Sequence, residues 1–184
     1  LRSKFVEAVS SEELLKDPQL GLVPSSPFWP TTPHQFYNEP LLDFGNRAIR
    51  KNLEETFRKL EKEGAKKWPL VINGEKIHTQ RTLMSENPSH PQSIVGIVAV
   101  ADQSHADKAL KYARKALLSW SRRPAKERIQ CIDKLADLMV RDRFRLMALM
   151  TMESGKPWLE SDGDVTEAID FCRYYALQMS TLCK

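Results

Sequence analysis

The sequence predicts a mainly helical chain with one or two β-hairpins. Apolar residues recur at helical spacing over several long stretches, and a central region has short apolar runs separated by turn dipeptides. The composition, with 41% hydrophobic and 28% charged residues among 184, is that of an ordinary soluble globular protein. A chain of this length can bury roughly 70% of its unfolded surface, so it needs neither disulfides nor metals to hold a core.

The first forty residues divide into two segments. Residues 1–17 contain a helical pattern in which Ser10 precedes Glu13 by three positions, the spacing of a capping box. Residues 18–40 contain six prolines and are predicted to be a linker, because proline removes amide donors and favours extended backbone. Its aromatic residues predict a linker that lies against a surface, with a solvated tether as the alternative; they are Phe28, Trp29, Phe36 and Tyr37.

The next segment predicts a helix followed by a hairpin. Apolar residues recur at helical spacing over residues 46–63, and Gly64 stands where a left-handed residue would end the helix. Two strand-like runs, 70–72 and 75–78, flank Asn73-Gly74, the dipeptide that best suits a two-residue hairpin turn.

Two further strands are predicted at residues 79–86 and 93–100, on either side of a turn at 87–91. The second carries several β-branched residues and is expected to be buried.

The C-terminal half predicts three helical stretches. The first covers residues 105–121 with Ser104 as its cap, and the second covers 125–154 with a break near Asp142. The third covers 159–180.

Charge and cysteine content exclude several classes of protein. The net charge of +4 is spread through mixed-sign stretches, so a nucleic-acid partner is disfavoured. The apolar runs are too short to span a membrane, and no secretory leader is visible, so we expect a cytoplasmic protein. Three cysteines in no metal-ligand spacing predict reduced thiols and no metal site; they are Cys131, Cys172 and Cys183.

The residues themselves point to little chemistry. No phosphate-cradling glycine loop or hydrolase motif occurs, and Cys172 falls on an apolar helix face, which favours an inert core thiol. Four histidines are interpreted as surface residues; they are His34, His78, His90 and His105.

One face of the last predicted helix is more informative. Asp164, Glu167, Phe171 and Tyr174 follow one another at helical spacing and place carboxylates among aromatic rings. Spacing alone favours a solvated or salt-bridged face over a ligand contact, and leaves both open.

The order of five sequence segments along residues 38–179 resembles the N-terminal part of 1-pyrroline-5-carboxylate dehydrogenases, which belong to the aldehyde dehydrogenase superfamily. The segments are NEPLLDF at 38–44, PLVINGEKI at 69–77, NPS at 87–89, ESGKPW at 153–158 and EAIDFCRYY at 167–175. The first fifteen residues look like the segment that follows the proline dehydrogenase barrel in bifunctional proline-catabolic enzymes.

The resemblance implies an α/β parent protein in which residues 41–184 form an incomplete N-terminal segment of the aldehyde dehydrogenase domain. Residues 1–17 would then end a preceding proline dehydrogenase region, and any FAD would belong to that upstream domain. The family oxidises glutamate γ-semialdehyde with NAD⁺, using a cysteine thiolate, an oxyanion-binding asparagine and a glutamate base. All of these lie downstream in family members, and Ile129-Gln130-Cys131 is not the nucleophile motif. We therefore expect no catalytic or cofactor-binding residue in this chain, and no activity from it alone.

One functional residue follows from the resemblance. The glutamate of the segment that begins at Glu167 points, in the family, toward the charged end of the substrate, which implies a substrate-binding role for Glu167. The exposed apolar faces of an incomplete domain would favour self-association, or oligomerisation through the missing parts. Two alternatives remain: a non-catalytic helical interaction or assembly module on the same scaffold, and an NAD-dependent aldehyde dehydrogenase of another substrate choice.

Overall fold

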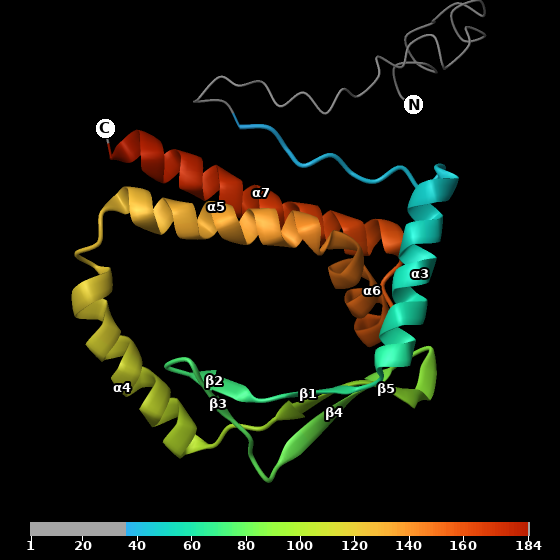
Figure 1. The fold of residues 1–184 in the computed structure, drawn as a ribbon, viewed down its shortest axis with the longest axis horizontal. Helices are drawn as coiled ribbons and strands as arrows, with labels where there is room; N and C mark the ends of the chain where they lie inside the picture. Colours follow the sequence, from blue (N-terminus) through green and yellow to red (C-terminus); the bar gives the residue numbers. More distant parts are fainter. Residues whose placement is uncertain (1–35, 184) are drawn as a thin grey trace, which may run out of the picture. The chain divides into compact units, whose positions relative to one another are not determined.

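The computed structural model describes residues 36–183 (Figure 1). The helix predicted within residues 1–17, and the linker predicted at 18–40 up to residue 35, lie outside the described residues. The mainly helical fold with short strands is confirmed.

The first described helix, α3 (Arg47–Glu63), begins and ends as the sequence predicts. The side chain of Asn46 accepts a hydrogen bond from the backbone of the first turn, which satisfies one of the free amides there. At the other end Gly64 has φ 68°, and its N–H donates to two carbonyls of the last turn. Leu53 and Leu60 are the buried residues of this helix.

The predicted hairpin forms between β2 (Leu70–Ile72) and β3 (Glu75–Ile77), which pair antiparallel. Asn73 and Gly74 have φ values of 53° and 78°. Positive φ at both central residues matches the right-handed twist of the strands, which explains why this dipeptide closes the turn.

A separate three-stranded sheet has the order β1-β5-β4. The antiparallel pair β4 (Thr82–Asn87) and β5 (His90–Ala99) confirms the second predicted strand pair. No sequence pattern predicted β1 (Lys66–Trp68), which pairs parallel to β5 and is exposed along its length. The expectation of a buried second strand is wrong for most of β5, because only Gly96 and Ala99 are buried.

Helix α4 (Gln103–Trp120) begins one residue earlier than its predicted cap, because Asp102 and not Ser104 is the capping residue. The Asp102 carboxylate accepts hydrogen bonds from the Ser104 hydroxyl at 2.6 Å and from the His105 backbone N–H at 3.1 Å. These two donors lower the pKa of Asp102 to about 2. No residue of α4 is buried, although it carries the apolar face expected from its sequence.

Three helices complete the described chain: α5 (Ala125–Arg141), α6 (Arg143–Ser154) and α7 (Trp158–Leu182). The break predicted near Asp142 separates α5 from α6, and α5 lies beside α7 (Figure 1). The helices share one apolar core with α3, formed by Leu53, Leu60, Ala136, Met147, Ala148, Met152, Val165 and Ile169. No helix within residues 36–183 has both the length and the apolar character needed to cross a membrane.

Candidate functional site

The chain segment that precedes α3 lies against α7. We call residues 36–42 the strap. Its first residue, Phe36, places its ring edge-on to the ring of Tyr174, with centroids 5.3 Å apart. Phe36 therefore contacts a surface, as expected of the linker aromatics, whereas Phe28 and Trp29 lie outside the described residues.

Asp170 ties the strap to α7 with both of its carboxylate oxygens. Oδ2 accepts a hydrogen bond from Nδ2 of Asn38 at 2.7 Å, and Oδ1 accepts one from the backbone N–H of Glu39 at 2.7 Å. Hydrogen bonds to a carboxylate are stronger than those between neutral groups, so this pair holds the strap in a defined register on the helix.

The side chain of Glu39 makes a second set of contacts beneath the strap. It accepts from Arg173 of α7 at 2.6 Å and lies 3.5 Å from Nη1 of Arg143 of α6. The side chains of Glu39 and Arg143 are only 10% and 8% exposed. Burying a charged group is costly unless it is paired, so Glu39 and Arg143 depend on their partners in this network.

A fully buried carboxylate, Asp162, completes this network. It accepts from Nε of Arg143 at 2.7 Å and from the backbone N–H of Leu42 at 2.8 Å, while Arg143 also donates to the carbonyl of Pro40 at 3.0 Å. The strap is therefore fixed along its length by polar groups of α6 and α7.

A hollow of about 500 Å³ lies between the strap and α7. Phe36, Asn38 and Leu41 line it from the strap. The residues that line it from α7 are Gly163, Thr166, Glu167, Asp170, Phe171, Tyr174 and Tyr175.

Glu167 differs from the other acidic residues of this region. It lines the hollow and is exposed, and its carboxylate has no hydrogen-bonding partner within the described part of the chain. Asp164, which the sequence placed on the same face, instead pairs with Lys156 and raises the pKa of that lysine. Glu167 is thus left as the carboxylate of the hollow that is free to accept a ligand cation.

Aromatic rings stand beside Glu167. Phe171 and Tyr175 are stacked with centroids 6.1 Å apart, and Tyr174 meets Tyr175 edge-on at 5.4 Å. Helical spacing predicted Phe171 and Tyr174 on this face, but it did not predict that Tyr175 and the strap would line the same hollow. A cation held near a carboxylate gains further attraction from aromatic faces, so the arrangement suits a ligand ammonium group.

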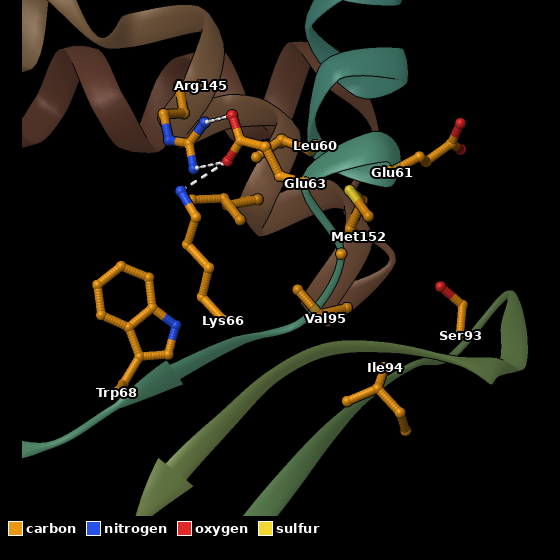
Figure 2. Close-up of a pocket in the computed structure, with 12 residues that line it drawn as sticks. Leu60, Glu61, Glu63, Lys66, Trp68, Ser93, Ile94, Val95, Arg145 and Met152 are labelled. Atoms are coloured by element: carbon orange, nitrogen blue, oxygen red, sulfur yellow. Dashed lines mark hydrogen bonds and ion pairs between the residues drawn. The ribbon is translucent and has the colours of Figure 1, made fainter.

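A smaller hollow of about 120 Å³ lies where the end of α3 meets β1, β5 and α6 (Figure 2). Figure 2 shows Arg145 and Lys66 both directed at Glu63. Arg145 donates to its two oxygens at 3.1 and 2.8 Å, and Lys66 lies 2.6 Å away. The pair of cations lowers the pKa of Glu63 to about 2. Arg145 and Lys66 both pair with Glu63. The cluster therefore connects α3, β1 and α6 and leaves neither cation available to bind a ligand.

The described cysteines and histidines lie away from the hollow of Glu167. Cys131 and Cys183 are exposed, and Cys172 is half-buried against the helical core, where an inert thiol was expected. His78 and His90 are exposed surface residues as predicted, whereas His34 lies outside the described residues. The third described histidine, His105, completes the capping box of α4.

The described glycines form no glycine-rich phosphate loop. Gly64 and Gly155 end helices and Gly74 turns a hairpin, while Gly45, which precedes the cap of α3, donates its N–H to the carboxylate of Asp43. At the start of α7 the local cation Lys156 is paired with Asp164, and Pro157 offers no amide. Within residues 36–183, no group of three or more acidic, histidine or cysteine side chains could hold a metal ion.

Comparison with known proteins identifies the family. The profile of the aldehyde dehydrogenase family matches residues 76–184. The 1-pyrroline-5-carboxylate dehydrogenase of Geobacillus sp. (strain WCH70) is 40% identical over 147 residues, which cover 80% of this chain and 28% of that protein. A 1-pyrroline-5-carboxylate dehydrogenase 1 from Halalkalibacterium halodurans gives the same identity and coverage. The chain thus spans less than a third of the length of these relatives.

Solved structures agree with this assignment. Proline utilization A from Bdellovibrio bacteriovorus matches with a TM-score of 0.82 and 43% identity, over 100% of this chain and 19% of that chain. A 1-pyrroline-5-carboxylate dehydrogenase from Thermus with bound NAD matches with a TM-score of 0.75 and 39% identity, over 77% of this chain and 28% of that one. The chain belongs to the aldehyde dehydrogenase family, and within it the chain is similar to the 1-pyrroline-5-carboxylate dehydrogenases.

Proposed function

We propose that this chain is the front segment of an NAD-dependent dehydrogenase that oxidises glutamate γ-semialdehyde to glutamate in proline catabolism. The observation that carries the proposal is the position of Glu167, an unpartnered carboxylate beside aromatic rings in the hollow under the strap. The relatives that are 40% identical to it over 147 residues supply the reaction class.

Glu167 would recognise the amino-acid end of the substrate. Glutamate γ-semialdehyde carries an α-ammonium group, which loses its hydration on binding and therefore needs acceptors. A carboxylate provides a charge-assisted hydrogen bond, and the neighbouring rings of Phe171 and Tyr175 add an attraction to positive charge. With the ammonium held at α7, the aldehyde would point away from this helix.

The chemical step would depend on residues outside this chain. Cys131 lies within α5 and not at a helix N-terminus, a position that reactive cysteines often occupy. In the complete domain, NAD⁺ would accept the hydride that the substrate loses. We therefore propose that the 184 residues alone do not oxidise the semialdehyde, and that the parent acts in the cytoplasm. The full coverage of this chain by a proline utilization A structure supports a bifunctional parent, with any FAD in the domain upstream.

The test is a substitution of Glu167 in a protein that carries these residues together with the remainder of the aldehyde dehydrogenase domain. Glu167→Gln should lower kcat/KM for glutamate γ-semialdehyde roughly 10- to 100-fold, because the negative charge that strengthens the hydrogen bond to the ammonium is removed and a neutral acceptor takes its place. Propanal, which has no ammonium group, should be oxidised nearly as well as before. NADH formation followed by absorbance measures both reactions.

Glu160→Gln is a matched control, because Glu160 is an exposed glutamate on the same helix that does not line the hollow. Glu160→Gln should leave kcat/KM unchanged for both glutamate γ-semialdehyde and propanal. Equal losses for semialdehyde and propanal in Glu167→Gln would contradict the assignment, and NADH formation by the isolated 184-residue chain would contradict its proposed inactivity.

A further inference from the structure

The wall of the hollow opposite α7 carries an amide whose orientation is fixed. Asn38 lines the hollow, and its side chain touches the carboxylate of Asp170 at 2.7 Å. Only the NH₂ end of an asparagine can donate to a carboxylate, so the nitrogen must face Asp170. The carbonyl oxygen of Asn38 is then the end of the amide that remains for a ligand.

The carboxylate of Asp170 is held in place, because its other oxygen also accepts a hydrogen bond from the strap. Oδ1 accepts the backbone N–H of Glu39, the next residue along the strap, at 2.7 Å. The backbone of Glu39 is held in turn by its own side chain, which pairs with Arg173 at 2.6 Å. Asp170 therefore has one oxygen assigned to the strap backbone and one to the Asn38 amide.

We propose that Asn38 is a second ammonium-binding residue of the hollow, and that Asp170 is the positioning residue that turns the Asn38 carbonyl oxygen toward the ligand. This inference rests on the proposed function of Glu167. The two acceptors would act on one ammonium group from opposite walls, Glu167 from α7 and Asn38 from the strap. The amide adds a directional acceptor on the strap wall of the hollow.

The substitution Asp170→Asn separates this role from a merely structural one. In that variant the carbonyl oxygen of residue 170 can still accept the Glu39 N–H, so its NH₂ group must face Asn38. The Asn38 amide then has to turn over to accept this hydrogen bond, and it presents its own NH₂ group to the hollow. The strap stays attached, but the hollow now offers a donor where the ammonium needs an acceptor.

The kinetic test uses a protein that carries residues 1–184 with the remainder of the domain. Asp170→Asn should raise KM for glutamate γ-semialdehyde by about tenfold or more with little change in kcat, and should leave propanal oxidation unchanged. Adding Asn38→Asp to Asp170→Asn restores an oxygen toward the hollow and keeps the hydrogen bond between the two side chains. The double variant should therefore recover most of the lost affinity.

Hydrogen exchange on the 184-residue chain reports strap attachment without any catalysis. Protection of residues 36–42 should persist in Asp170→Asn and fall in Asp170→Ala, which removes both contacts. An Asp170→Asn enzyme with unchanged KM, or a double variant no better than the single one, would overturn the inference. If Glu167→Gln discriminates between the two aldehydes while Asp170→Asn does not, only the role of Asn38 fails; if neither discriminates, the proposed function fails as well.

Discussion

At the scale of single residues, Gly155 and Gly163 should respond in opposite ways to an added methyl group. Gly163 lies inside α7, and a Cβ placed there has no atom within 4 Å. Gly155 ends α6 with φ 71°, and its Cβ would lie 3.3 Å from Cγ of Pro88. Alanine fits the helical backbone at position 163, whereas it is strained in the left-handed backbone at position 155.

We predict that Gly163→Ala raises the free energy of unfolding by about 0.4–1 kcal/mol, because it reduces the freedom of the unfolded chain and favours helix. Gly155→Ala should lower it by about 1–2 kcal/mol through left-handed strain. Urea unfolding followed by circular dichroism measures both. Destabilisation by Gly163→Ala would show that the open space beside this glycine is needed by the folded chain.

The acidic residues of α7 show how far the site could be predicted from residue types. Asp162, Asp164, Glu167 and Asp170 are all carboxylates on one helix, and spacing alone groups Asp164 with Glu167. In the structure Asp162 is buried against Arg143, Asp164 pairs with Lys156, and Asp170 holds the strap. Spacing placed Glu167 on this face and the family resemblance gave it a substrate-binding role, whereas its lack of a partner follows from the contacts that engage the other three carboxylates.

At the scale of secondary-structure elements, the cluster around Glu63 joins α3, β1 and α6. Two cations hold the pKa of Glu63 at about 2, below its ordinary 4.5. A carboxylate whose pKa is lower in the folded state stabilises the fold at pH values above its unfolded pKa. That contribution is lost as the pH falls from about 4.5 toward 2.

We predict that Glu63→Gln lowers the melting temperature at neutral pH, because Arg145 and Lys66 lose their shared partner. The difference from the unsubstituted chain should be constant above about pH 5 and should narrow as the pH is lowered toward 3. Thermal melts across this range measure it. Glu61→Gln, a change in an exposed neighbour that joins no such cluster, is the control; a difference for Glu63→Gln that persists unchanged at pH 3 would contradict the argument.

At the scale of the whole molecule, a large amount of apolar surface is left uncovered. On α4, which has no buried residue, Leu117 and Leu118 are 59% and 67% exposed. On α7, Phe171 and Tyr175 are also exposed, at 53% and 63%. Exposed large apolar side chains favour association in water, so we expect the 184-residue chain to self-associate as its concentration rises.

We predict that the double variant Leu117→Gln/Leu118→Gln associates less than the unsubstituted chain at equal concentration. Its stability should change little, because neither leucine contributes to the core. Sedimentation velocity measures the first and thermal unfolding the second. The control Lys111→Gln/Lys115→Gln alters exposed residues of the same helix that are already polar. If the double leucine variant associates as strongly as this control, the surface through which the chain self-associates does not include Leu117 and Leu118.

The sequence by itself determined the elements whose causes are local. Helix α3, the β2–β3 hairpin and the break at Asp142 follow from periodicity, capping residues and turn dipeptides, each of which acts within a few residues. The ordered segments that the chain shares with its relatives indicated the family. Only the tertiary structure decided the pairing of β1 with β5 and the closure of the strap over α7. Asn38 and Asp170 stand 132 positions apart, and no local periodicity encodes a hydrogen bond across that separation.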